Sequence, residues 1–123
     1  MDVQKVASYC KRAYMLLDSA PCDDSGDVCL TSPVYKEHNE VSLELIKYVG
    51  ASRTDNAPPV SSDASDEIFG VLRQLHDMPA KRGGAVMFSL LATNACQFGM
   101  TEVQKEQVNE WQRERVHGRN TSQ

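Results

Sequence analysis

An acidic segment near the first third of the chain carries the residue types that bind calcium. It reads Asp23-Asp24-Ser25-Gly26-Asp27. An EF-hand loop places oxygen ligands at positions 1, 3, 5 and 12 with a glycine at position 6. With Gly26 at position 6, position 1 falls on Pro21, which has no side-chain oxygen. The motif therefore fails, and the sequence predicts a solvated acidic loop.

Two cysteines and a histidine, Cys22, Cys29 and His38, are the residue types of a zinc site. Structural zinc sites usually hold their ligands in short pairs such as C-x2-C or H-x3-H. The spacings here are longer and no fourth ligand stands out, so we predict no metal and place His38 at the edge of the core. Cys22 and Cys29 could form a disulfide in an oxidising compartment. Free thiols are favoured, because no export signal is visible.

The turn Lys81-Arg82-Gly83-Gly84 could hold an anion on the free N–H groups of the helix that follows it. A P-loop requires G-x-x-x-x-G-K-[ST], which is absent, and a tight turn explains the glycines equally well. No G-x-S-x-G motif and no catalytic signature around a cysteine or histidine occurs. We therefore predict that the protein is not an enzyme and uses no catalytic residue and no cofactor.

Glutamates recur every four residues along a helix expected from Thr101 to near Val116. They are Glu102, Glu106, Glu110 and Glu114. Like charges at this spacing each cost on the order of a few tenths of a kcal/mol, partly offset by Lys105 and Arg113. Trp111 lies on the opposite, apolar side. It either anchors the helix to the protein, which is the favoured interpretation, or joins Arg113 and Arg115 at a partner interface, where Trp and Arg are enriched.

The segment 84–99, GAVMFSLLATNACQFG, is apolar on nearly every side and is bracketed by glycines. That pattern predicts a helix buried at the centre of a small bundle. A thin polar seam interrupts it, formed by Ser89, Thr93, Asn94 and Gln97. The seam could line a ligand cavity, or it could face solvent or a second copy of the chain, because buried polar groups must find partners.

Three further amphipathic helices are expected before this segment, because apolar residues recur there at spacings of three and four. They cover roughly residues 2–18, 33–49 and 62–78, with loops at 19–32 and 51–61. The sequence thus predicts an all-α, single-domain bundle of about five helices. The domain is expected to span residues 1–117, and residues 118–123 are expected to form a polar, frayed tail.

Composition narrows the class of protein further. The net charge is −4, with 41% hydrophobic and 24% charged residues, values near the globular average that argue against disorder over the whole length. No basic block is present, so direct nucleic-acid binding is not expected. The charged residues within 2–12 argue against a signal peptide, and a central helix of about 21 Å is too short to cross a membrane. We expect a cytoplasmic protein.

These observations favour a small non-enzymatic protein–protein interaction module, such as an inhibitor, an immunity-type protein, an adaptor or an assembly subunit. Its contact surface is expected to combine the acidic loop with the C-terminal helix. The residues are Asp23, Asp24, Asp27, Glu106, Glu110, Trp111, Arg113 and Arg115. The partner would be another protein, and a homodimer is a further option. The alternative is a small-molecule-binding bundle or minor enzyme with a cavity lined by the polar seam.

Overall fold

A computed structural model describes residues 2–52, 60–79 and 83–121, with side chains as far as Arg115. In these ranges the chain forms five α-helices and one short 3-10 helix, without a strand. They are α1 (Val3–Ser19), α2 (Pro33–Ala51), α3 (Asp63–Asp77), α4 (Ala85–Thr93), η3 (Ala95–Phe98) and α5 (Glu102–Thr121). The predicted all-α bundle is confirmed.

Capping side chains determine where the helices begin. Asp2 accepts a hydrogen bond from the Lys5 N–H at the start of α1, and Ser32 accepts one from Tyr35 at the start of α2. Ser62 and Ser65 form a reciprocal capping box at the start of α3. Each bond satisfies an N–H group that the first turn of a helix leaves unpaired. Because these signals are local in sequence, the starts of the first three helices agree with prediction to within about two residues.

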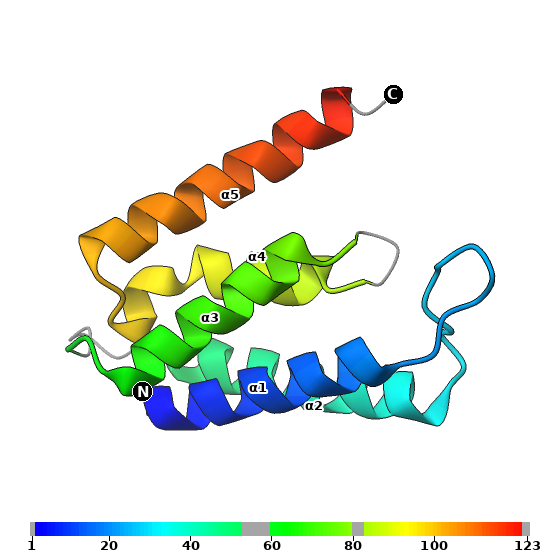
Figure 1. Ribbon diagram of the computed structural model, residues 1–123. Coiled ribbons are helices and arrows are strands. Elements are labelled where there is room, and N and C mark those ends of the chain that lie inside the picture. The colour runs from blue at the N-terminus through cyan, green and yellow to red at the C-terminus, as the bar shows by residue number, and fades with distance from the viewer. Residues whose placement is uncertain (1, 53–59, 80–82, 122–123) are drawn as a thin grey trace.

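The helices pack around one core (Figure 1). Helix α1 lies against both α2 and α3, α4 packs on α3, and α5 crosses over α3, α4 and η3. The core contains large side chains from every α-helix and from η3. Those with almost no exposed surface include Leu17, Leu45, Ile68, Leu72, Phe88, Leu91, Phe98 and Val108.

The central apolar segment is helical over nearly the predicted range, but it is not one continuous helix. Helix α4 ends at Thr93, and the chain tightens into η3 after Asn94. The buried Asn94 side chain donates to the Leu90 carbonyl at 2.8 Å, and the Gln97 N–H donates to the Asn94 carbonyl at 2.9 Å. An asparagine side chain competes with the backbone for such carbonyls, which accounts for the break. The expectation of a single helix over 84–99 was wrong in this respect.

Helix α5 extends to Thr121, so the expected end near Val116 was wrong. Polarity alone does not end a helix: Arg, Asn and Thr have ordinary helix propensities, and no proline follows. Residues 118–121 of the expected tail are therefore helical, and residues 122 and 123 lie outside the described residues. Within the ranges described, no helix has the length and apolar content needed to cross a membrane.

Candidate binding groove

A groove of about 370 Å³ runs between α2 and α4. Helix α2 turns its core face, with Val41, Leu45 and Val49, mainly toward α1. Its adjacent face, with Ser42, Leu43 and Ile46, forms one wall of the groove. The opposite wall is formed by Val86, Met87 and Leu90 of α4, and Gly83 and Gly84 lie at the end of the groove where α4 begins. The volume falls within the range of about 300–1,000 Å³ that is typical of ligand sites.

Apolar side chains are exposed on both lips of the groove. Leu43 on α2 is 55% exposed and Val86 on α4 is 71% exposed. Both residues line the groove, and ligand sites are typically concave and mostly apolar. The groove therefore offers a surface that an apolar ligand or partner would cover.

His38 supplies a polar group to the groove, although it is only 5% exposed. Its Nδ1 lies 2.7 Å from the Ala13 carbonyl oxygen, and because that oxygen can only accept, Nδ1 carries the proton. Burial lowers the pKa of His38, against the opposing effect of the Ala13 bond. At neutral pH the ring is therefore uncharged and Nε2 is an acceptor. The Ser42 Oγ is 3.5 Å from Nε2, longer than a usual hydrogen bond.

The two glycines at the end of the groove have positive φ angles, +94° for Gly83 and +86° for Gly84, as a tight turn requires. A Cβ on Gly84 would lie 3.1 Å from a Leu75 methyl, so the backbone is closely packed there. A Cβ on Gly83 would lie 4.0 Å from Cγ1 of Val28. Val28, which follows the acidic loop in the chain, therefore lies close to the end of the groove. Lys81 and Arg82 of the predicted turn lie outside the described residues.

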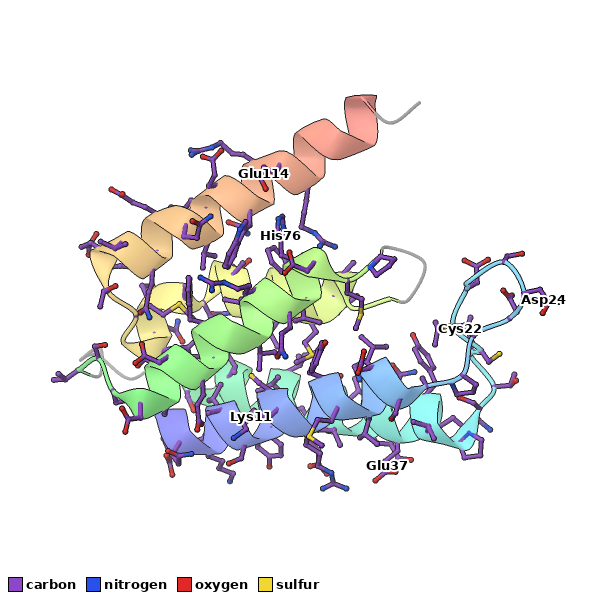
Figure 2. All side chains as sticks on the ribbon, viewed as in Figure 1. Lys11, Cys22, Asp24, Glu37, His76 and Glu114 are labelled. Atoms are coloured by element: carbon purple, nitrogen blue, oxygen red, sulfur yellow. The ribbon has the colours of Figure 1, made fainter. Side chains whose placement is uncertain are left out.

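Hydrogen bonds within the acidic loop hold it in a closed turn. The Asp23 carboxylate accepts from the N–H groups of Ser25 at 2.9 Å and Asp27 at 3.1 Å, and the Asp23 N–H donates to the Asp27 carbonyl. Asp23 thus shapes the loop, while Asp24 and Asp27 are exposed. Figure 2 shows Asp24 at the outer tip of the loop. In the described part of the chain, no three His, Cys, Asp or Glu residues are grouped as a metal would need.

Cys22 and Cys29, at the base of the loop, are not joined by a disulfide. Cys22 pairs with Val28 in a single antiparallel bridge, and the Cys29 N–H donates to the Pro21 carbonyl at 2.9 Å. Successive side chains of an extended segment point to opposite faces. The two thiols therefore lie on different faces of this short pairing, an arrangement that opposes a disulfide.

Trp111 lies in the core. It is 7% exposed, and its ring centroid lies 5.3 Å from those of both Phe69 and His76. The His76 Nε2 also lies 3.1 Å from an oxygen of Glu114, which ties α3 to α5 (Figure 2). This arrangement matches the favoured anchor interpretation, and it removes Trp111 from the surface where the expected partner contact would need it.

The remaining residues predicted on the C-terminal helix have partners within the protein or lie on another face. Glu110 pairs with Arg113, and the Arg115 guanidinium lies over the Phe88 ring at 4.6 Å. Glu106, Glu110 and Arg113 line a shallow depression on α5. Figure 1 shows the acidic loop at the opposite end of the molecule from the start of α5. The predicted residues therefore form two separate surfaces.

The polar seam lies outside the groove. Ser89 and Thr93 are exposed and Asn94 is buried, whereas the groove faces the Val86 and Leu90 side of α4. Sequence reasoning missed Leu43 and Val86, although Leu43 carried a signal, because it is apolar and lies off the inner stripe of its helix.

Comparison with protein-family models, with curated proteins and with solved structures found no match for this chain. The function must therefore be argued from the groove and its surroundings.

Proposed function

We propose that the protein is a small non-enzymatic interaction module that binds a segment of another protein in the groove between α2 and α4. The observation that carries the proposal is the pair of exposed apolar side chains, Leu43 and Val86, on opposite lips of one concavity. Fully burying a leucine or valine side chain is worth about 1.5–3 kcal/mol. Because both are already partly covered, a partner would gain about 1–2 kcal/mol from each.

The shape of the site favours a helical segment as the bound element. Two helices form its walls, and an amphipathic helix laid between them can place its apolar residues along both walls at once. The acidic loop, Asp23 to Asp27, is also part of the proposed contact surface. Glu106, Glu110 and Arg113 lie on a different face and would serve a second contact. A cytoplasmic location remains part of the proposal.

The test compares two valine-to-glutamate variants with equal charge change. Val86→Glu places a carboxylate on the lip of the groove, and Val60→Glu places one just before α3, where the valine is 87% exposed. Tagged wild type and both variants are used for affinity capture from native extract, followed by quantitative mass spectrometry. Circular dichroism verifies that each variant is folded.

We expect a stoichiometric partner that wild type and the Val60→Glu variant retain and that the Val86→Glu variant loses at least tenfold. Recovery of the same partner by all three proteins would contradict the proposal. The affinity of the purified partner, measured by calorimetry, then replaces recovery as the quantitative readout.

A second candidate is small-molecule binding in the same groove, and the His38–Ser42 pair favours it. The uncharged His38 ring offers an acceptor at Nε2, and the Ser42 hydroxyl is half-buried beside it. A ligand with an apolar body and one hydroxyl or N–H donor would suit these groups. Ser42→Ala should weaken such a ligand several-fold while leaving a protein partner bound, as ligand-observed NMR with a metabolite mixture would show.

A further inference from the structure

We infer that His76 and Glu114 form a pH-sensitive latch, which holds α5 on α3 more tightly when the His76 ring is protonated. The inference goes beyond the proposed function and does not depend on the groove. It rests on three features of the described residues: the contact between the two side chains, the position of His76 in α3, and the stacking of its ring on Trp111.

Polar side chains join α5 to α3 near the start of α5 and again beyond Trp111. Near the start, the Gln104 amide donates to an oxygen of Asp66 at 2.8 Å. Beyond Trp111, Nε2 of His76 lies 3.1 Å from an oxygen of Glu114 (Figure 2). Histidine is the side chain whose charge ordinarily changes between pH 5 and pH 8. The second contact therefore changes with pH in this interval, whereas the first involves no histidine.

Both charge states of His76 can bind Glu114, but the charged state binds it more strongly. A carboxylate oxygen can only accept, so Nε2 carries the proton that it donates. In the neutral ring this is an ordinary hydrogen bond, and after protonation it becomes a charge-assisted hydrogen bond within an ion pair. The His76 side chain is 21% exposed and that of Glu114 is 52% exposed, so water and salt screen the pair only in part.

The surroundings of the ring also favour its charged form. His76 lies in the last turn of α3, where the negative end of the helix dipole stabilises a cation. Its ring stacks on Trp111 with an angle of 21° between the planes, and the face of an indole attracts a cation. Nδ1 is buried without a hydrogen-bond partner among the described residues. It lacks one as an acceptor in the neutral ring and as a donor in the charged ring, so this cost is present in both states.

Among the described residues, the other charges around the ring come from α3 and α5. On α3, Arg73 lies one turn earlier and Asp77 follows in the chain. On α5, the Arg115 guanidinium lies over an aromatic ring of α4 that neighbours the His76 ring. Helix α4 adds no charge, because the segment 83–101 has no charged residue. The two arginines oppose protonation, but the carboxylate in direct contact with Nε2 outweighs them, because Coulomb energy falls with distance.

The experiment measures how often α5 opens at two pH values. Amide hydrogen exchange of α5 is followed by NMR at about pH 5.5 and about pH 7.5, on either side of the usual histidine titration. Each exchange rate is divided by that of an unstructured peptide under the same conditions, which gives the opening equilibrium of the helix. At low salt, we expect α5 of wild type to open about threefold to tenfold less often at the lower pH.

Two glutamate-to-glutamine variants separate the latch from net charge. Glu114→Gln removes the carboxylate that contacts His76, although its amide oxygen can still accept from Nε2. Glu110→Gln removes the same charge one turn earlier on α5, where the glutamate pairs with Arg113. The first variant should reduce the pH difference to less than about twofold, and the second should keep it. His38 is present in all three proteins, so its own titration cancels in the comparison.

The same dependence on pH in wild type and in the Glu114→Gln variant would overturn the inference. More frequent opening at the lower pH, or an equal loss of the dependence in both variants, would also overturn it. Salt provides a further check, because an ion pair that is partly exposed weakens as salt rises. A wild-type difference that stays unchanged at about 1 M salt would contradict the latch. Both glutamates are about half exposed, so neither substitution should disturb the fold.

Discussion

Replacing Trp111 by alanine tests whether this residue is an anchor of the fold. Its ring is 7% exposed and stacks on Phe69 and His76. A buried tryptophan covers up to about 250 Å², which at about 25 cal/mol per Å² is an upper figure of about 6 kcal/mol. Because α5 lies at the edge of the bundle and can settle into the space, we expect a loss of about 3–4 kcal/mol in the free energy of unfolding.

The assay is urea unfolding followed by circular dichroism, since the substitution removes the single tryptophan of the chain. Trp111→Phe is the matched control, because it keeps an aromatic ring between Phe69 and His76 and should lose about 1–2 kcal/mol. A loss below about 1 kcal/mol for the alanine variant, with an unchanged dependence on urea, would refute the anchor interpretation. If only α5 lost its structure, the slope of the unfolding free energy against urea concentration would fall, which would show that the helix detaches separately.

Three other predictions concern the glycines, the histidine and the cysteines. Gly84→Ala should destabilise the protein by about 1–3 kcal/mol, because φ is +86° and the new Cβ would crowd a leucine. Gly70→Ala should stabilise it by about 0.5–1 kcal/mol, because a Cβ there meets nothing within 4 Å. The melting temperatures of the two variants test both expectations. Burial lowers the pKa of His38 below its usual 6.5. Because protonating the buried ring costs free energy, the free energy of unfolding is highest above about pH 6.5 and falls as the pH drops toward the lower pKa of the folded state. In the His38→Gln variant the urea midpoint should therefore change less with pH over this range. Burial raises the pKa of Cys10 to about 12, and Cys96 is exposed. Iodoacetamide at about pH 8 should therefore label Cys96 in the native protein and Cys10 only in urea, as mass spectrometry would show.

The helices could be predicted because their signals are local. The apolar stripe of α1, with Val6, Cys10 and Leu17, repeats at helical spacing, and Ser32 and Ser62 mark starts through bonds that span three residues. The helix break at Asn94 also depends on a hydrogen bond between residues close in sequence. The presence of an asparagine alone, however, does not show whether its side chain turns back to Leu90 or points outward. That choice depends on the packing around it, which leaves Asn94 buried.

The groove could not be predicted, because it depends on which helices do not pack together. Leu43 lies off the inner stripe of α2, so only a second neighbouring helix could cover it. Helix α4 packs on α3 rather than on α2, and Leu43 therefore stays exposed. The exposure of Val86 could not be predicted either, because the segment around it is almost wholly apolar and no pattern shows which of its sides faces solvent. The acidic loop was visible in the sequence, but the approach of Val28 to Gly83 was not.

The packing of α5 has a consequence for synthesis on the ribosome. Every element that α5 contacts, from Phe69 on α3 to the α4–η3 segment, precedes it in the chain. While the chain is being made, α1, α2 and α3 can assemble first, and the aromatic surface that Trp111 later covers stays open until the last helix emerges. A released chain that ends before residue 102 would therefore have an uncovered aromatic surface, a species suited to chaperone capture.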